Sequence, residues 1–421
     1  MSANFDSDVA LTLEIAFDSE PFDETQSFTD ITSFLRAFTT RRGRANELGE
    51  FVAGSMSFSV SNADNRFNPN NTSSPFYDSA NAITKIQPLK RVRMSATYDS
   101  VTYRIFEGFL QSIPVKFISE GADSIVTFTC VDAFKIFQSA QLEGVGWRLG
   151  LAGFSEIGLS TRLSYTDVQE LSSERVSRIL DAIGFPSNRR DINTGTKQVV
   201  SQATSTNILT GLRECELAEN GQFFIAKDGK ATFRNRDYRL TNTKAINVQG
   251  IFSNDGSNLP YTNVSTSFDD NEIINVYEWQ RSGGTAQYKA DTNSILKYRA
   301  KESAKSTINI SDADVLSIIE QKIAETSLPI VRIDELICNP RENTSLWEQV
   351  LGREFGDRIS VKIVNVDGSS FTDELFVESI SHTVNASSQS WSWKATLSPA
   401  GSSAWILGQA KLGEGTRFVY S

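Results

Sequence analysis

The stretch that most constrains the fold of this chain is residues 41–70, RRGRANELGEFVAGSMSFSVSNADNRFNPN. Within it, Met56, Phe58 and Val60 alternate with serines, and a side-chain period of two is typical of a strand with one buried and one solvent-facing side. The asparagine-rich run that follows contains residues that bond to their own backbone and tolerate left-handed conformations. The stretch therefore predicts a half-buried strand followed by a long, ordered surface loop.

The remainder of the N-terminal third continues the alternating pattern. Leu11, Leu13 and Ile15 share one side of a first strand, and a tight polar turn separates two later strands. The predicted strands are residues 9–17, 31–40, 55–61, 91–98, 101–113 and 125–130. Six strands with short turns and one long loop predict a small tube-type β-barrel or sandwich over residues 1–140.

Helical spacing first becomes clear in the middle of the chain. Ser172 or Ser173 can cap a helix, and Gly184 lies just past its end. An Asp-Gly pair, which two-residue turns favour, marks a hairpin further on. The predicted elements are helices over residues 172–183 and 206–219 and a hairpin of residues 223–226 and 231–234. With an irregular, glycine-rich linker at 144–160, they predict an α+β insert domain over residues 141–250.

A second β-rich block completes the chain. Apolar residues at helical spacing predict a helix over residues 311–326, for which Ser311 is the cap. The predicted strands are residues 263–268, 272–279, 330–338, 358–364, 374–384 and 389–397. We therefore expect a second tube-type β-barrel domain over 251–400 and a C-terminal tail at 401–421. The predicted fold class is mainly β with α+β parts, in which two β-barrel or sandwich domains flank an α+β domain, and the two β-blocks suggest a duplication.

The charge of the chain restricts its relation to nucleic acid. The formal net charge is -10, and general binding to DNA requires a basic surface that neutralises phosphates. An acidic wall would instead repel the phosphate backbone and let DNA slide past. The charge therefore excludes a general nucleic-acid-binding protein without excluding DNA that passes close by.

The sequence gives no sign of export, of a membrane span or of a disulfide framework. No window of about 18 apolar residues occurs, and the first eight residues are polar and acidic. We therefore expect neither a membrane span nor a signal peptide, and synthesis in a cytoplasm. Cys130, Cys215 and Cys338 are widely spaced and odd in number, which indicates buried structural thiols.

Catalytic chemistry finds little support in the residues. His382 is the only histidine, and it lies in an alternating strand where a packed role is more common than that of a base. The Gly-x-Ser-x-Gly, His-Glu-x-x-His and P-loop motifs do not occur. The asparagine-rich loop fails the spacing of a calcium-binding loop. No catalytic, cofactor-binding or metal-binding residue is therefore predicted, and the protein is not expected to be an enzyme.

The residues best suited to contact a partner lie on both sides of the serine strand. Arg41, Arg42 and Arg44 form a predicted basic turn, and in an acidic protein a partner's carboxylates are their most economical target, although a solvated turn is an equal alternative. The loop after the strand adds polar residues that a neighbour could contact. The candidate subunit-contact residues are Arg41, Arg42, Arg44, Asn65, Arg66 and Asn68.

Several short motifs follow one another in a distinctive order along the chain. They are Arg42-Gly43-Arg44, the serine-alternating strand, Asn65-Arg66-Phe67-Asn68-Pro69-Asn70, Tyr77, Arg91-Val92-Arg93-Met94, Phe106-Glu107-Gly108, Cys130-Val131-Asp132-Ala133-Phe134, Ile274-Asn275-Val276 and Phe355-Gly356-Asp357-Arg358. This order resembles the minor tail proteins of long-tailed bacteriophages, and is most similar to those that form the baseplate or tail-tip hub. The resemblance covers about residues 5–400.

This resemblance implies a homotrimeric structural hub in the virion tail tip, made in the host bacterial cytoplasm. Each subunit would add two related barrels to a ring, so that three subunits adapt a sixfold tail tube to a threefold tip. The implied partners are a distal tail protein or tail tube ring, the tape-measure protein, and tail-tip or fibre proteins, while DNA passes through the lumen without specific binding. Acidic side chains are then expected to line that lumen.

Three alternatives remain open from the sequence. A distal tail ring protein would also place a barrel on the tube, but as a hexamer. A tail-tip protein could contact a host surface glycan through its insert domain or through Trp391 and Trp393, although a buried core role suits these tryptophans better. A cell-wall hydrolase is the poorest alternative, because no constellation of residues supports it.

Overall fold

The computed structural model describes residues 9–116, 124–140, 169–200, 207–386 and 388–400. Its central feature is one mainly antiparallel sheet of fourteen strands, eight of which come from the first part of the chain. These eight are β1 (Val9–Ile15), β2 (Thr29–Asp30), β3 (Leu35–Gly43), β4 (Val52–Ser61), β7 (Arg91–Tyr98), β8 (Val101–Ser112), β9 (Val115–Lys116) and β10 (Ile125–Val131). All six strands predicted for this region are present.

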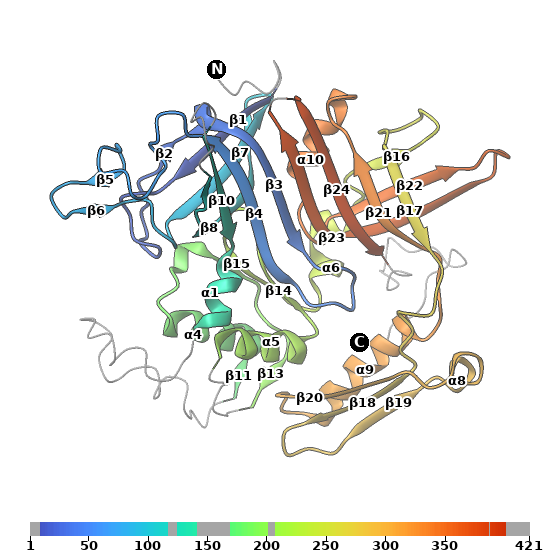
Figure 1. The fold of residues 1–421 in the computed structure, drawn as a ribbon. Coiled ribbons are helices and arrows are strands. Elements are labelled where there is room, and N and C mark those ends of the chain that lie inside the picture. The colour runs from blue at the N-terminus through green and yellow to red at the C-terminus, as the bar shows by residue number, and fades with distance from the viewer. Residues whose placement is uncertain (1–8, 117–123, 141–168, 201–206, 387, 401–421) are drawn as a thin grey trace.

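The other six strands of the sheet come from the last part of the chain. They are β16 (Ile251–Ser253), β17 (Asn263–Ser267), β21 (Arg332–Cys338), β22 (Arg358–Val364), β23 (Ser370–Asn385) and β24 (Ser390–Pro399). The main path of the sheet runs β17-β21-β24-β23-β3-β4-β10-β8-β7-β1-β2. Figure 1 shows β3 and β4 beside β23 and β24 across the middle of the molecule. The mainly β fold is therefore confirmed, but the strand pairing among the described residues does not close into a barrel.

The two parts of the sheet repeat one arrangement. The first β-block, β3-β4-β10-β8-β7, and the second β-block, β17-β21-β24-β23-β22, have the same order in space and in sequence, and all of these pairs are antiparallel. The repeat ends at the sixth strand, because β1 is antiparallel to β7 whereas β16 is parallel to β22. The two β-blocks meet where β3 pairs with β23.

Helices and short strands lie against the lower end of the first β-block in Figure 1, and α6 lies beside β23 of the second β-block. Phe134 and Phe137 of the first helix stack edge-on or at a tilt against Phe223 of the hairpin, which joins this region to the sheet's core. The elements are α1 (Ala133–Ser139), β11 (Glu170–Leu171), α4 (Ser172–Ala182), β12 (Arg190–Ile192), β13 (Gln198–Val199), α5 (Ile208–Glu219), β14 (Gln222–Ile225), β15 (Ala231–Arg234), α6 (Tyr238–Thr241) and α7 (Thr243–Ile246). The predicted linker at 144–160 and the tail at 401–421 lie outside the described residues.

Between β17 and β21 the chain forms a separate small unit with its own core. Tyr277, Trp279, Val315, Ile318 and Ile319 are buried together there. The unit comprises β18 (Val276–Arg281), β19 (Gln287–Ala290), α8 (Thr292–Tyr298), β20 (Glu302–Thr307) and α9 (Asp312–Thr326). The strand predicted at 272–279 therefore belongs to a three-stranded sheet outside the second β-block, because alternation shows that a strand has a buried side but not which sheet it joins.

Local capping differs from the prediction at two places. The strand expected from residue 31 begins at Leu35, because Thr32–Phe34 form a short 3-10 helix, η1. Neither Ser172 nor Ser173 caps α4, whose N-cap is Leu171 with its N–H donating to Glu174 Oε2 at 2.9 Å. Ser172 is buried instead, and its hydroxyl donates to Glu219 Oε2 at 2.7 Å.

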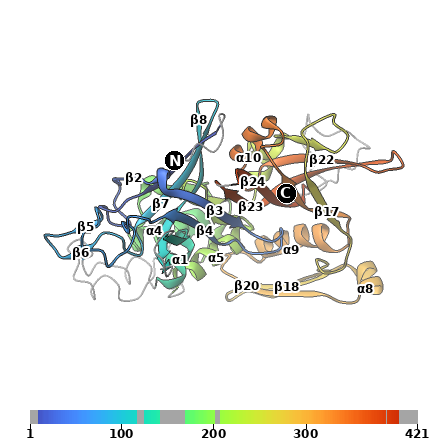
Figure 2. The ribbon, with the colours of Figure 1, turned by 45° about the horizontal axis from the view of Figure 1, so that its top comes forward.

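The remaining elements lie in long loops. The loop after β4 carries the small hairpin of β5 (Tyr77–Asp78) and β6 (Ile83–Thr84), and the loop after β21 carries η3 (Thr344–Leu346) and α10 (Trp347–Gly352), while η2 (Ser187–Arg189) precedes β12. In Figure 2 the β7–β8 and β22–β23 hairpins both extend beyond the body of the molecule. In the described part of the chain, no helix is long and apolar enough to cross a membrane.

Candidate functional site

One side of the central strands carries an uninterrupted row of hydroxyl groups. Residues directly opposite one another on six adjacent strands, from β24 across β23, β3, β4 and β10 to β8, are all serine or threonine. The row consists of Ser392, Thr383, Thr39, Ser57, Thr129 and Ser112. At about 4.8 Å between neighbouring strands, the row is roughly 24 Å wide, and it crosses from the second β-block into the first.

Flanking positions extend this row into a surface that we call the hydroxyl face. Ser390, Ser59 and Thr127 lie on one side of the row and Ser381 and Ser55 on the other. Ser59 Oγ and Thr127 Oγ1 are 3.3 Å apart, and Ser112 hydrogen bonds to Thr129 in the same way. A shallow hollow of about 190 Å³ lies between β3, β4, β8 and β10 on this side. The serine and threonine side chains that form this surface are short and polar, and the hollow in it is shallow.

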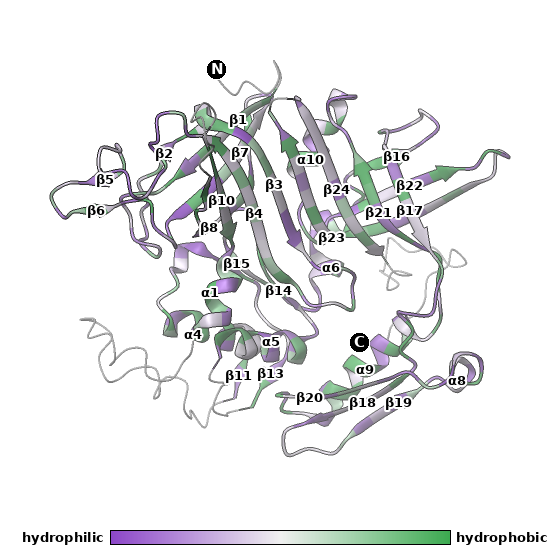
Figure 3. Ribbon diagram, in the orientation of Figure 1, coloured by the Kyte–Doolittle hydropathy of each residue, from purple (hydrophilic) through white to green (hydrophobic). Residues whose placement is uncertain are grey.

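The opposite side of the same strands is the core, so that apolar and polar colours alternate along them in Figure 3. Phe58 stacks on Phe128 with ring centroids 4.9 Å apart, and Phe38 meets Trp391 edge-on at 5.9 Å. Trp391 and Trp393 are both buried, as expected for core residues. The two-residue period of the strands thus separates an aromatic core from the hydroxyl face.

The three arginines predicted as a turn do not form one. Arg41 and Arg42 lie inside β3, and Arg44 follows its last residue. Arg41 is exposed on the hydroxyl face, whereas Arg42 points to the core, where both of its terminal nitrogens lie 3.1 Å from Glu354 Oε1. The prediction of a basic turn was wrong, because the alternation of the strand extends through Gly43 and sends neighbouring arginines to opposite sides.

Arg44 joins three elements through a buried carboxylate. Its Nε lies 2.6 Å from Glu378 Oε2 on β23, and Arg239 Nη2 on α6 lies 2.6 Å from the other oxygen. Ser398 donates a third hydrogen bond to the same carboxylate. Burial alone would raise the pKa of Glu378, but the two guanidinium groups lower that pKa to about 2. Arg42 and Arg44 therefore hold the junction of the two β-blocks together within one chain.

The asparagine-rich loop is ordered by its own side chains. Asn62 Oδ1 accepts a hydrogen bond from the Phe67 N–H at 2.8 Å, and Asn65 is left-handed with φ of 59°. Arg66 pairs with Asp64 and lies over the Phe34 ring at 4.2 Å. The predicted ordered loop is thus present. Arg41 pairs with Ser55, and the loop begins after Ser61, which is about 20 Å further along β4. Asn65, Arg66 and Asn68 therefore lie past the opposite end of β4 from the arginines.

The Cys-Val-Asp-Ala-Phe motif acts in the fold as a helix cap. Asp132 accepts hydrogen bonds from the N–H groups of Phe134, at 3.0 Å, and Gly54, at 2.6 Å. Burial raises the pKa of Asp132 to about 7. This carboxylate begins α1 and ties it to β4, which is a structural role.

The single histidine and the three cysteines are also buried. His382 Nδ1 accepts a hydrogen bond from Trp391 Nε1 at 3.3 Å, and burial lowers the pKa of His382 to about 3. Burial raises the pKa of each cysteine thiol, to about 12 for Cys215 and Cys338. Among the described residues, no group of three or more His, Cys, Asp and Glu side chains could hold a metal ion.

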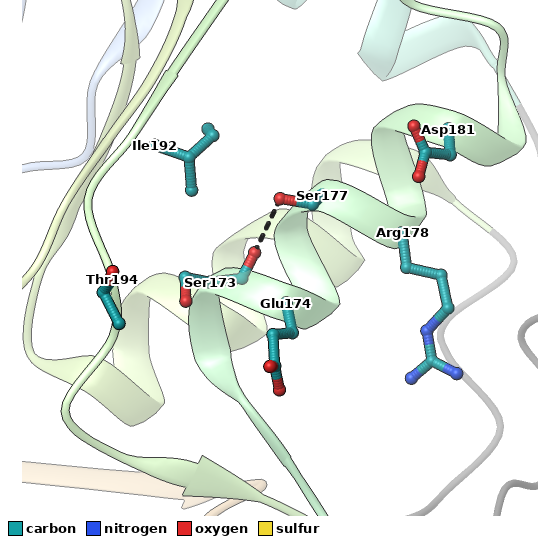
Figure 4. A pocket seen from close by; sticks show the side chains of 7 residues that line it. All are labelled: Ser173, Glu174, Ser177, Arg178, Asp181, Ile192 and Thr194. Atoms are coloured by element: carbon teal, nitrogen blue, oxygen red, sulfur yellow. Dashed lines mark hydrogen bonds between the residues drawn. The ribbon is translucent and has the colours of Figure 1, made fainter. Parts of the chain in front are cut away.

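A hollow of about 570 Å³ lies beside α4. Figure 4 shows its lining, in which Ser177 donates to the Ser173 carbonyl at 3.0 Å. Glu174 accepts from the N-terminus of α4, and Asp181 pairs with Arg190 at 2.7 Å. Both carboxylates of this hollow thus have partners in the local structure.

Comparison with solved structures shows that this fold is that of phage tail proteins. The chain is similar to the tail protein of Neisseria meningitidis MC58, with a TM-score of 0.55 and 7% identity over 93% of this chain and 96% of that one. It is also similar to the 43 kDa tail protein of prophage MuSo2 from Shewanella oneidensis, with a TM-score of 0.51 and 10% identity over 93% and 98% of the two chains. No family model and no curated protein matches the sequence.

Only part of the hydroxyl face is evident in the sequence. The serine alternation at residues 55–61 marked one strand of the hydroxyl face. The matching alternation of Thr127 with Thr129 and of Ser381 with Thr383 was a signal of the same kind, but only strand order shows that these residues adjoin. The half-buried Glu354 and the buried Glu378 carried no local signal.

Proposed function

We propose that this protein is a non-enzymatic structural component of a phage tail, and that it forms a hub ring in the tail tip or baseplate. The observation that carries the proposal is the hydroxyl face, which runs without a break across the junction of two β-blocks that share one strand order. The fold shared with phage tail proteins supports the same reading. The hydroxyl face would line the channel through which DNA and the tape-measure protein pass.

The chemistry of the hydroxyl face suits a surface along which a polyanion moves. Short hydroxyls stay hydrated and carry no formal charge, so they release no counterions and form no ion pairs with phosphates. Arg41 and Lys394 add positive charge, but Lys394 pairs with Glu335. The sequence led us to expect an acidic lining that repels DNA. For these strands we propose instead a nearly neutral lining that does not attract it.

A ring would use the repeated β-blocks. Three chains would supply six blocks, which adapts a sixfold tube to a threefold tip, as the resemblance to tail hubs implies. The neighbours of such a ring would be a distal tail or tube ring above and tail-tip or fibre proteins below. The helix α1 and the hairpin of β14 and β15 would lie outside the channel, because they pack through Phe134, Phe223 and Phe224 on the core side of the sheet.

Native mass measurement of the assembled protein tests this proposal. A trimer of the 46.6 kDa chain, about 140 kDa, is expected. Six copies per ring would favour a distal tail ring protein. A chain that remains monomeric and is absent from purified tails would refute the structural role, and clearing of peptidoglycan in a zymogram would indicate a hydrolase.

A further inference from the structure

The chain contains one complete junction between β-blocks, which shows how two such blocks join. Residues 37–43 of β3 pair antiparallel with residues 379–385 of β23, with Thr39 opposite Thr383. Along the same edge of β23, residues 370–376 pair with β22. The first half of the long strand thus pairs within its own block, and the second half receives a strand from the other block.

The registers of the two blocks match where each hairpin enters its β-block and at the bulge that follows. Arg91 lies opposite Phe109 in one hairpin, and Arg358 lies opposite Phe376 in the other. Gln111 is the extra residue of a bulge against β10, and Glu378 is the extra residue of the same bulge against β24. The offset is constant, since 358 minus 91 and 378 minus 111 both equal 267. β8 with β9 is therefore equivalent to β23.

The strand β17 is equivalent to β3 by the same argument. Ser57 and Glu335 face the equivalent residues Thr129 and Thr396. Thr39 lies opposite Ser57, and Ser265 lies opposite Glu335. Ser265 therefore occupies in the second block the place of Thr39 in the first.

Two edges lack the partner that their equivalents have. Within the described residues, β17 pairs with β21 alone, whereas β3 pairs with both β4 and β23. Likewise β9 pairs with β10 alone, whereas the equivalent half of β23 pairs with both β24 and β3. The edge of β17 and the edge of residues 112–116 are thus the two halves of the junction that β3 and β23 complete.

We propose that β17 of one copy of this chain pairs with the β8–β9 edge of a second copy, in the register of the β3–β23 junction. This inference rests on the proposed ring and assigns its intermolecular surface. In that register, Thr266 faces Val115 of the second copy, as Thr40 faces His382. Ser265 faces Lys116, as Thr39 faces Thr383. Because the two edges differ, the contact is heterologous, and repeating it generates a ring when the rotation closes.

The backbone of the proposed acceptor edge is compatible with this pairing. Ala386 N–H donates to the Arg36 carbonyl, and Arg44 N–H donates to the Glu378 carbonyl. Since backbone groups alternate between the two sides of a strand, Ile380 and His382 face β3, and their equivalents Ile113 and Val115 face the open edge. Pro114, which has no N–H, falls where the backbone faces β10, so it removes no donor from the new contact.

Side chains at the two open edges are more exposed than the equivalent side chains at the β3–β23 junction, as expected for edges that pair with a second copy. Phe268 is 66% exposed, although its equivalent Arg42 is 5% exposed within the completed junction. Ile113 and Val115 are half-buried, whereas Ile380, equivalent to Ile113, is 2% exposed. The apolar side of both edges is therefore more exposed than in the completed junction, as expected if a second copy buries it.

The equivalence of β17 with β3 also predicts the residue at which the proposed pairing between copies ends. Gly43, with φ of 111°, approaches β23 so closely that a Cβ there would lie 2.3 Å from the Glu378 carbonyl oxygen. Asp269, two residues past the end of β17, holds the place of Gly43 and carries a side chain. The pairing between copies thus ends at Phe268, one residue earlier than the internal one.

Disulfide trapping tests the register directly. In Ser265→Cys/Lys116→Cys, the two cysteines of neighbouring copies would be directly opposite, about 4.5–5.5 Å apart at Cα, which permits a disulfide. Mild oxidation of the assembled protein is expected to give covalent oligomers up to the full ring on a non-reducing gel. The control Ser265→Cys/Thr102→Cys places the second thiol at the far end of β8 and should give none. The three native cysteines are buried and do not compete.

A second variant tests the apolar contact. Phe268→Asp is expected to weaken ring assembly at least tenfold while leaving the thermal unfolding of the monomer unchanged, because Phe268 is exposed in the single chain. The matched control is Leu296→Asp, which removes another exposed apolar side chain, 72% exposed, from α8. The control should assemble like the parent protein.

The outcomes separate this inference from the proposed function. Rings that form normally but neither trap the Ser265–Lys116 pair nor respond to Phe268→Asp would refute this interface and leave the hub intact. A chain that forms no ring and is absent from tails would refute both. Trapped closed oligomers, lost in Phe268→Asp, would establish the interface.

Discussion

At the residue scale, buried charges decide how the two β-blocks meet. Glu378 is fully buried and pairs with Arg44, which directly follows β3, and with Arg239 of α6, both at 2.6 Å. Arg42 makes a parallel contact with Glu354, whose second oxygen accepts the N–H of Lys227 at 3.0 Å. Removing one partner from such a group leaves the other charge buried and uncompensated. The junction therefore depends on single carboxylates.

Glu378→Gln is expected to destabilise the protein by about 3–5 kcal/mol at neutral pH, the usual cost of breaking a buried ion pair. The folded-state pKa of Glu378, about 2, lies below that of an unfolded glutamate. Its contribution to stability is therefore complete above about pH 5 and is lost as the pH falls towards 2. Denaturant unfolding of the parent should weaken over that window, and less so in the variant. The exposed Glu302→Gln is the control, and an equal effect of both variants would contradict the prediction.

At the scale of elements, the close approach of β3 to β23 depends on a glycine. Gly43 adopts a φ of 111°, which strains any residue with a Cβ, and lies against the backbone of Glu378 and Ser379. Gly368, at the tip of the β22–β23 hairpin, has a φ of 82° but no atom within 4 Å of an added Cβ. Both glycines have a positive φ that strains other residues, but only Gly43 lies close to a neighbouring strand.

Gly43→Ala should therefore lower the thermal unfolding midpoint more than Gly368→Ala. Gly368→Ala is expected to cost about 1 kcal/mol from its left-handed backbone alone. Gly43→Ala adds a backbone clash that must push the strands apart, for a further 1–3 kcal/mol or so. Calorimetry of both variants measures the difference. Equal midpoints would show that the junction of the β-blocks tolerates separation.

At the scale of the whole molecule, one sheet unites segments from both ends of the chain. The hydroxyl face exists only because β23 and β24, near the C-terminus, continue the surface of β3, β4 and β10. The protein as a whole carries a net charge of -10, yet the row of serines and threonines at the centre of this surface carries no formal charge. The distribution of charge, more than its sum, therefore determines how the proposed channel meets DNA.

The triple variant Thr39→Lys/Ser57→Lys/Thr383→Lys is expected to slow DNA release from phage particles that carry it. Three adjacent cations per chain would bind phosphates, and added salt should restore the parental rate because such binding releases counterions. The control, Ser282→Lys/Ala304→Lys/Ser306→Lys, adds the same charge to exposed positions of the β18–β20 unit. Parental release rates in the first variant would remove the hydroxyl face from the channel.

Much of the local structure follows from the sequence because its causes are local. The alternation around Met56, Phe58 and Val60 predicted β4, and helical spacing predicted α4, α5 and α9 within a few residues. Side-chain period and capping depend on neighbours in the chain, so a single sequence reveals them. The resemblance to phage tail proteins, carried by the order of short motifs, agrees with the fold that the comparisons found.

The sequence alone thus determined most of the longer strands and helices and which side of the stretch at 55–61 is polar. Tertiary structure decided the rest: that Arg42 and Arg44 turn inward to Glu354 and Glu378, that residues 276–281 form a separate sheet, and that Thr39 stands between Ser57 and Thr383. The pairs Arg42–Glu354, Arg44–Glu378 and Thr39–Thr383 each join residues hundreds of positions apart. Strand order is set by the packing of the whole core, which no local period encodes.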